Sequence, residues 1–283
     1  YRLMKTKLRL VLSIPLLFFC FTSLAQEAGI IWEERQMAPG RTTLSGQSIK
    51  SEAGRSFVLH EADLRSQLGK LRDDPRDDVR LSFPDASGKP VSFRVTERSV
   101  MEEALQQRYP GIRSYIGYAT DGSRTRIRFS LSHKGLQGMI VDPETARALY
   151  LEPDPSQPDV YLLFSREELQ PSLQGWKCKT EASPSKQLPG SVTAKLIDDQ
   201  LLRTYRLAVA TTGEYTEYHG GTVVDALAAI NATVTRVNEV FERDLAIQLQ
   251  LIAGTEQVIY TDPVTDPFGG NFSAEVQTVL SSE

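Results

Sequence analysis

Residues 222–245, TVVDALAAINATVTRVNEVFERDL, decide how the C-terminal part of the chain folds. Thr222 stands as a potential N-cap before this stretch, with Asp225 three residues on as a variant of the capping box. The apolar side chains then recur at alternating steps of four and three residues, which predicts one apolar stripe on a helix of about six turns. The stripe comprises Val223, Leu227, Ile230, Val234, Val237 and Phe241.

Two apolar segments flank this helix. Residues 202–211, LRTYRLAVAT, are expected to form a largely buried strand that Gly220-Gly221 separates from the helix, and residues 245–252, LAIQLQLI, a second strand. A strand, a long helix and a second strand form a crossover unit, and such a unit places its two strands in parallel. Residues 201–283 are therefore expected to be the start of an α/β domain.

The preceding part, residues 26–168, shows a different pattern. In residues 126–131, RIRFSL, apolar and polar side chains alternate, which predicts a strand with one buried face and one wet face. Turn-forming residues separate further strands of this kind. We expect an α+β domain dominated by an antiparallel meander, with helices at 61–71 and 100–109 and strands at 57–60, 79–83, 91–95, 113–119, 125–131, 136–141, 148–152 and 160–164.

Residues 169–200 are predicted to be a linker between these two domains. They lack hydrophobic periodicity and contain Pro171, Pro184, Pro189 and Gly190. The segment also carries several lysines, at which a protease would cut easily once they are exposed.

The N-terminus predicts export. Met4 is followed by basic residues and by an apolar run at 10–24, and Ser23-Leu24-Ala25 has small residues at both positions that a signal peptidase requires. We expect residues 1–25 to be a signal peptide cut after Ala25, so that the mature protein is secreted or extracellular. A membrane anchor is the alternative, but the run is short for a span.

Composition and chain ends narrow the possibilities further. The net charge is −4, and no basic stripe is interleaved with aromatic residues, so nucleic acid is not an expected partner. After signal cleavage no segment is apolar enough to span a membrane. Because the sequence starts at Tyr1 and stops at Glu283 within a predicted helix, we expect it to be part of a longer reading frame.

Three histidines and two glycosylation sequons are the obvious candidate sites. His60 opens HEADL, which departs from the zinc motif H-E-x-x-H because Leu64 replaces the second histidine, so a surface pair at a helix start is expected. His133 is expected in a solvated hairpin turn and His219 in a structural role. The sequons begin at Asn231, within the predicted helix, and at Asn271.

Cys178 would be the one thiol that remains after signal cleavage, since Cys20 lies in the predicted leader. Three roles are open for Cys178: an incidental thiol, a disulfide partner of a cysteine elsewhere, or a metal ligand supplied to another domain. A thiolate binds zinc strongly, and the neighbouring lysines would favour that ionised form.

The chain from Leu201 onward resembles the secreted bacterial reprolysin-like (M12B-type) zinc metallopeptidases of the metzincin clan. The resemblance is carried by YRLAVATTGEYTEYHGG at 205–221, RVNEVFERDLAIQLQLI at 236–252 and IYTDPVTDPFGGN at 259–271. The preceding residues 112–140, IRSYIGYATDGSRTRIRFSLSHKGLQGMI, look like the propeptide that accompanies these enzymes.

This resemblance implies a zymogen with zinc as its cofactor, protein or peptide substrates, and an activating protease as a partner. The family binds zinc through H-E-x-x-H-x-x-G-x-x-H, with glutamate as general base, and this pattern occurs nowhere in the sequence. No catalytic residue is therefore assigned, and these residues alone should be inactive. Cys178 lies where a cysteine switch would occupy the zinc, although Lys179 stands where such switches have glycine.

A non-enzymatic extracellular module, either an adhesin or an inhibitory prodomain, is the alternative to the peptidase precursor. The expected antiparallel meander is compatible with this alternative, because a fold does not fix a function.

Overall fold

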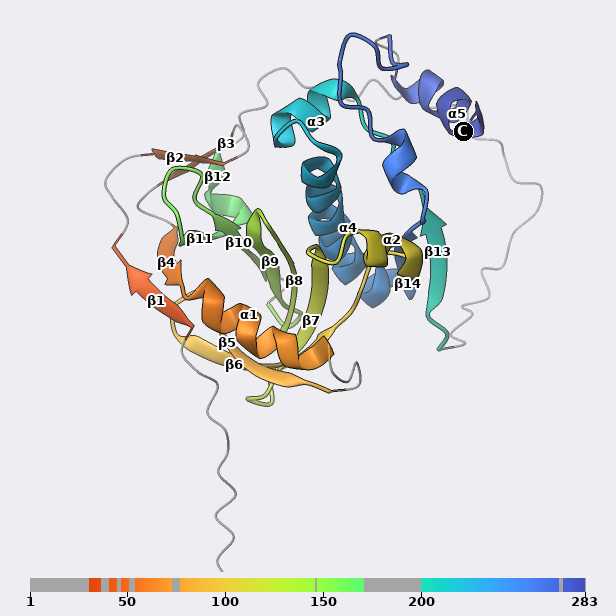
Figure 1. The fold of residues 1–283 in the computed structure, drawn as a ribbon. Coiled ribbons are helices and arrows are strands. Elements are labelled where there is room, and N and C mark those ends of the chain that lie inside the picture. The colour runs from red at the N-terminus through yellow and green to blue at the C-terminus, as the bar shows by residue number, and fades with distance from the viewer. Residues whose placement is uncertain are drawn as a thin grey trace, which may run out of the picture.

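The computed structural model (Figure 1) describes the greater part of the chain. The predicted leader, most of the linker with Cys178, and Asn271 lie outside the described residues, so the predictions made for them stay predictions. The described ranges are 31–36, 41–44, 47–50, 54–72, 77–145, 147–170, 200–269 and 272–282.

A nine-stranded antiparallel sheet forms the N-terminal part and confirms the predicted meander. The sheet curls, so that its two edge strands β1 and β5 contact each other. In spatial order its strands are β1 (Trp32–Arg35), β4 (Arg55–Leu59), β11 (Val160–Ser165), β10 (Arg147–Pro153), β9 (Gly135–Asp142), β8 (Arg126–Ser132), β7 (Arg113–Ala119), β6 (Pro90–Glu97) and β5 (Val79–Pro84).

The hollow of this curled sheet is filled by a first apolar core. Aromatic rings contact one another inside it, with Phe83 and Phe129 5.3 Å apart between centroids. Helix α1 (Glu61–Gly69) and the short helix η1 (Lys70–Arg72) cover one side, as predicted for residues 61–71, and bury Leu64 and Leu68 in the same core. A small sheet of β2 (Arg41–Leu44), β3 (Gln47–Lys50) and β12 (Leu169–Gln170) lies beside the large one.

The helix predicted at 100–109 is shorter than expected. Only α2 (Glu103–Arg108) is helical, and Gln106 Nε2 donates to the carbonyl oxygen of Ile112, 2.8 Å away. Residues 100–102 are not helical, and Met101 forms an isolated parallel β-bridge with Leu251. Sequence pattern could not show this, because the partner strand lies about 150 residues further along the chain.

The C-terminal part contains the predicted crossover unit. Strand β13 (Arg203–Leu207), helix α4 (Val223–Leu245) and strand β14 (Ile247–Leu251) follow in order, and the two strands pair in parallel. Thr222 is the N-cap of α4, and its hydroxyl accepts a hydrogen bond from the amide of Asp225 at 3.1 Å. Helix α5 (Phe272–Ser282) is the last described element.

Two details of this part differ from the prediction. The strand expected at 202–211 spans only β13, and residues 203–206 are exposed rather than buried. Helix α3 (Gly213–His219) was not predicted, because a helix of seven residues is too short to show an apolar period. Thr212 marks its start, since its hydroxyl accepts a hydrogen bond from the amide of Tyr215.

Helix α4 packs on the outer face of the curled sheet, against β7, β8 and β9 (Figure 1). Its apolar stripe enters a second core that both parts of the chain build. The first part supplies Val100, Met101, Leu105 and Ile112, and the second supplies Ala226, Leu227, Ala228, Ile230, Val234, Leu251 and Ile259. The two predicted domains therefore share this second core.

No described helix combines the length and the apolar composition that a membrane crossing requires.

We expect Leu227→Ala to lower the free energy of unfolding by about 2–5 kcal/mol, because Leu227 is fully buried in the second core. Val224 lies on the same helix and is 41% exposed, so Val224→Ala is the matched control and should change that free energy by less than about 0.5 kcal/mol. Denaturant unfolding of both variants measures the difference. Equal effects would contradict the burial of this face of α4.

Candidate functional site

The residues singled out by sequence are spread over three places. His60 is exposed at the start of α1, and Glu61 pairs with Arg65 at 2.6 Å, so the prediction of a surface pair is confirmed. His219 ends α3 with its ring 4.4 Å from that of Tyr215, which agrees with a structural role. Burial lowers the pKa of His219, and the nearby charge of Lys134 adds to this shift.

His133 lies exposed in the turn between β8 and β9, as predicted. In addition, its Nε2 atom is 2.8 Å from the Oδ1 atom of Asp225. Lys134 Nζ reaches the same oxygen at 2.8 Å, and the Thr222 hydroxyl donates to Oδ2 at 2.6 Å. The hydrogen bonds from Lys134 and Thr222 hold the pKa of Asp225 well below its usual range, against the opposing effect of burial.

Zinc does not fit the residues that the structure describes. Within the described ranges, no group of three or more His, Cys, Asp or Glu side chains could hold a metal ion. A zinc site needs at least three protein ligands in one place. No reaction step is therefore assigned to these residues.

The most developed polar arrangement is the contact between α4 and the sheet. Arg128, at the middle of β8, and Glu239, on α4, are each 1% exposed, and Arg128 Nε donates to Glu239 Oε2 at 3.1 Å. Arg128 Nη2 also donates to Glu242, one turn further along the helix. Arg126 Nη2 lies 2.6 Å from the other oxygen of Glu239. Two arginines of one strand therefore meet two glutamates of one helix.

Burial is the largest influence on the pKa of Glu239. Burial raises this pKa, although the charges of Arg126 and Arg128 oppose the shift. Such a buried ion pair contributes little net stability compared with an apolar contact. Removing one partner is costly, however, because it leaves the other charge buried and unpaired. The pair therefore ties the position of α4 to that of β8.

A buried hydrogen-bond network lies beside the ion pairs. The side-chain amide of Asn231 donates to the hydroxyls of Ser114 at 2.9 Å and Ser130 at 2.8 Å. The Thr235 hydroxyl donates to the backbone oxygen of Asn231 at 2.7 Å. Because the amide nitrogen of Asn231 is buried and engaged, a glycan on this sequon is incompatible with the fold.

This contact corrects the prediction of a wet face on the strand at 126–131. Arg128 and Ser130 belong to the polar side of the alternation, yet both are buried, because α4 covers them. The sequence of α4 contained a signal that the polar face of β8 would be covered. Asn231, Thr235, Asn238 and Glu239 form a second, polar stripe on α4, and all four are buried.

The first part of the chain also covers one edge of β14. The amide of Leu251 donates to the carbonyl of Val100 at 2.7 Å, and the amide of Glu102 donates to the carbonyl of Leu251 at 2.8 Å. The Glu102 carboxylate then accepts from the amide of Ala253 at 2.8 Å and from Arg206 Nε at 2.9 Å. These bonds lower the pKa of Glu102, the bond from Ala253 most. Residues 100–102 thus cover this edge of β14 through an isolated β-bridge at Met101 and the hydrogen bonds on either side of it.

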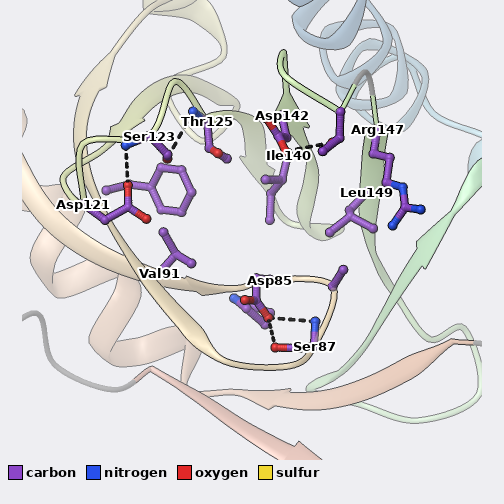
Figure 2. A pocket seen from close by; sticks show the side chains of 14 residues that line it. Asp85, Ser87, Val91, Asp121, Ser123, Thr125, Ile140, Asp142, Arg147 and Leu149 are labelled. Atoms are coloured by element: carbon purple, nitrogen blue, oxygen red, sulfur yellow. Dashed lines mark hydrogen bonds between the residues drawn. The ribbon is translucent and has the colours of Figure 1, made fainter.

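A cavity of about 390 Å³ opens at the hairpin end of the curled sheet (Figure 2). Figure 2 shows Asp85, Asp121 and Asp142 around it, each at a turn. The carboxylates accept hydrogen bonds from backbone amides of their own turns, those of Ser87, Ser123 and Glu144, at 2.8–2.9 Å. The acids are engaged in this way, and no His, Cys or Lys is among the described lining residues, so we assign no catalytic role to them.

Comparison with known proteins adds one finding. Residues 202–282 match the family model described as Metallo-peptidase family M12B Reprolysin-like. The matched range contains β13, α3, α4, β14 and α5, and none of the nine-stranded sheet. A search of curated proteins found no match to the chain.

The low pKa of Asp225 predicts how the α4 contact responds to acid. A depressed carboxyl pKa contributes stability that is present above the ordinary value of 3.8 and is lost as the pH falls below it. Asp225→Asn should therefore be less stable than the unaltered protein near neutral pH, by about 1 kcal/mol, because it removes the charge that faces Lys134 and the N-terminus of α4. This difference should shrink as the pH is lowered below about 4.

Denaturant unfolding at several pH values measures that difference. Asp63→Asn is the matched control, because Asp63 is an exposed acid in the first turn of α1. A difference for Asp225→Asn that stays constant from pH 7 to the acid limit would contradict the proposed electrostatic role.

Proposed function

We propose that this protein, whose residues 202–282 belong to the reprolysin-like M12B metallopeptidase family, is the precursor of a secreted zinc-dependent endopeptidase. Residues 201–283 would open the peptidase domain, residues 26–168 would be the propeptide, and residues 169–200 would connect them. The observation that carries the proposal is the family match over a segment that also has the parallel crossover unit β13–α4–β14.

The whole enzyme would hydrolyse peptide bonds of protein or peptide substrates with water activated by zinc. The family's zinc motif is absent from these 283 residues, and the described residues hold no alternative metal cluster. The chain as given would therefore be inactive by itself. The ligands and the general base would have to come from residues outside this sequence.

A propeptide role for residues 26–168 is supported by how closely the sheet holds the family segment. It buries one side of α4 through Arg128 and covers the β14 edge with residues 100–102. A peptidase domain held in this way would keep part of its own sheet paired with the propeptide. An activating protease that cuts within residues 169–200 would be the natural partner.

Export and latency are the further parts of the proposal. The basic and apolar pattern of residues 4–25 supports secretion with a cut after Ala25. Cys178 would be the candidate cysteine switch, supplying a thiolate to the zinc of the complete enzyme. An incidental thiol and a disulfide with a cysteine elsewhere remain its alternative roles.

A non-enzymatic extracellular module is the second candidate. Its support is the antiparallel sheet of residues 32–165, a fold that does not fix a function. An adhesin or a separate inhibitory prodomain would both fit this description. The presence or absence of the zinc motif in the complete reading frame separates the two candidates.

We expect residues 26–283, produced alone, to bind no stoichiometric zinc and to cleave no peptide bond. Metal analysis after dialysis and cleavage of an unfolded protein substrate would measure both properties. Zinc-dependent peptidase activity from this chain, abolished by a chelator, would contradict the assignment of the ligands to residues outside it.

The complete reading frame tests the second half of this expectation, that the zinc ligands lie beyond these 283 residues. Sequencing the coding DNA past the codon for Glu283 should show H-E-x-x-H-x-x-G-x-x-H within roughly a hundred residues. The corresponding protein should then lose activity when the glutamate of that motif is replaced by glutamine. A finished reading frame without the motif would favour the non-enzymatic module.

A further inference from the structure

The cavity at the hairpin end of the curled sheet lies apart from the family segment, because its described lining residues all fall between 84 and 149 (Figure 2). We propose that this cavity binds a small apolar amine, whose hydrocarbon body packs inside the curled sheet and whose ammonium group lies among the three aspartates at the mouth. Such binding needs neither zinc nor peptidase activity, so it goes beyond the proposed function.

The inner walls of the cavity are apolar. One wall is formed by Val91 and Phe93 of β6, and the opposite wall by Ile140 of β9 and Leu149 of β10. Strands β7 and β8 separate β6 from β9 in the sheet, so these side chains share a cavity because the sheet curls. Val91 and Leu149 pack against the first core but stay half-buried. An apolar group in the cavity would remove this remaining apolar surface from water, which favours binding.

The mouth of the cavity is acidic. Figure 2 shows one aspartate at each of three turns: Asp85, Asp121 and Asp142. Hydrogen bonds from Ser123 lower the pKa of Asp121, and those from Thr145 and the amide that follows Asp142 lower the pKa of Asp142. Both carboxylates are therefore ionised at neutral pH.

Asp85 carries a charge as well. Burial acts to raise its pKa, but the hydrogen bonds from Ser87 and Lys89 outweigh burial and lower it. An ionised carboxylate has about four acceptor positions, so the bonds within each turn leave room for a further donor. An ammonium group brings three such donors.

One cation lies among the described lining residues, and it does not neutralise this mouth. Arg147 is exposed and also lines an adjoining cavity of about 440 Å³, as Ala86 and Leu149 do. In that second cavity it acts on Glu167, whose pKa is lowered first by hydrogen bonds from its own backbone and from Ser165, and then by the charge of Arg147. The three aspartates therefore keep a net negative charge at the mouth.

Size and charge together define the class of ligand. The volume of about 390 Å³ lies within the range of roughly 300–1,000 Å³ that small-molecule sites occupy. A neutral apolar molecule would use the walls but gain nothing from the mouth. An anion of the same size would be repelled by the carboxylates, whereas a cation would be attracted.

The test uses residues 26–283 and three probes of similar size, namely phenylbutylamine, phenylbutanol and phenylbutyrate. The backbone amides of Ser87, Ser123 and Glu144 donate to the three aspartates, so their NMR signals report on the mouth. Phenylbutylamine should shift these signals to saturation, with a dissociation constant on the order of 1 mM or lower. Phenylbutanol should bind about fivefold more weakly, and phenylbutyrate at least about tenfold more weakly.

Two results would overturn the proposal. The first is an amine titration in which these three signals do not approach saturation at about ten times that concentration. The second is binding of phenylbutanol or phenylbutyrate that equals or exceeds that of the amine. Either result leaves the family match and the sequencing experiment untouched, and a reading frame without the zinc motif leaves the amine site untouched.

A double variant tests the charge at the mouth. Asp121→Asn combined with Asp142→Asn should weaken binding of phenylbutylamine on the order of tenfold, because two partly exposed carboxylates lose their charge. The asparagine oxygens can still accept the amides of their turns, so the turns are kept. The matched control combines Asp63→Asn with Asp244→Asn, two exposed acids outside the lining, and should leave binding unchanged. Equal affinity in the two double variants would contradict the role of the mouth.

A filling variant tests the apolar walls. Val91→Phe should abolish the saturable shifts, since the larger side chain occupies the space that the ligand needs. Arg94→Phe is its control, because Arg94 is 63% exposed on the other face of β6 and adds the same ring outside the cavity. Unchanged binding in a folded Val91→Phe protein would overturn the location of the site. If that variant does not fold, the aspartate variants still decide the outcome.

Discussion

Helix α4 has two sides that must leave water, and the rest of the structure follows from this requirement. Its apolar stripe packs in the core that includes Leu251, and its polar stripe faces β7 and β8 of the large sheet. Buried polar groups are tolerated only when they are hydrogen-bonded or paired. The Arg128–Glu239 pair and the Asn231 network meet this condition and join the helix to the sheet.

The same condition explains why the strands β13 and β14 do not stand alone. Two strands and one helix enclose little apolar volume, and a two-stranded unit is marginal without further cover. Residues 100–102 extend this unit on the β14 side, and α2 adds Leu105 to the core beneath it. In the proposed precursor, the propeptide would therefore be part of the structure of the peptidase segment rather than a separate attachment.

The sequence predicted the elements with a strong internal pattern. The alternating strands of the meander, helix α1, the N-cap Thr222 and the parallel pairing of β13 with β14 were all confirmed. The exceptions depend on partners that are distant in sequence. Alternation shows that Arg128 and Ser130 share a face, but it cannot show that α4 covers that face. The same limit applies to residues 100–102, which are not helical and bridge to β14 at Met101.

Candidate site residues were harder to predict than elements. Sequence reasoning concentrated on histidines and on Cys178, whereas the described side chains converge on arginine, glutamate and asparagine. The match in charge between Arg126 and Arg128 on one strand and Glu239 and Glu242 on one helix was visible in the sequence. Pairing them required the fold, since these residues lie more than a hundred positions apart.

Native-state hydrogen exchange tests the central claim that the sheet and α4 form one cooperative unit. The account predicts that the buried amides of α4 and of β8 open with the same free energy and with the same dependence on denaturant. The residues to compare are 226–239 and 127–131. If the α4 amides exchange through a separate, smaller opening while β8 stays protected, the two parts are independent and the account is wrong.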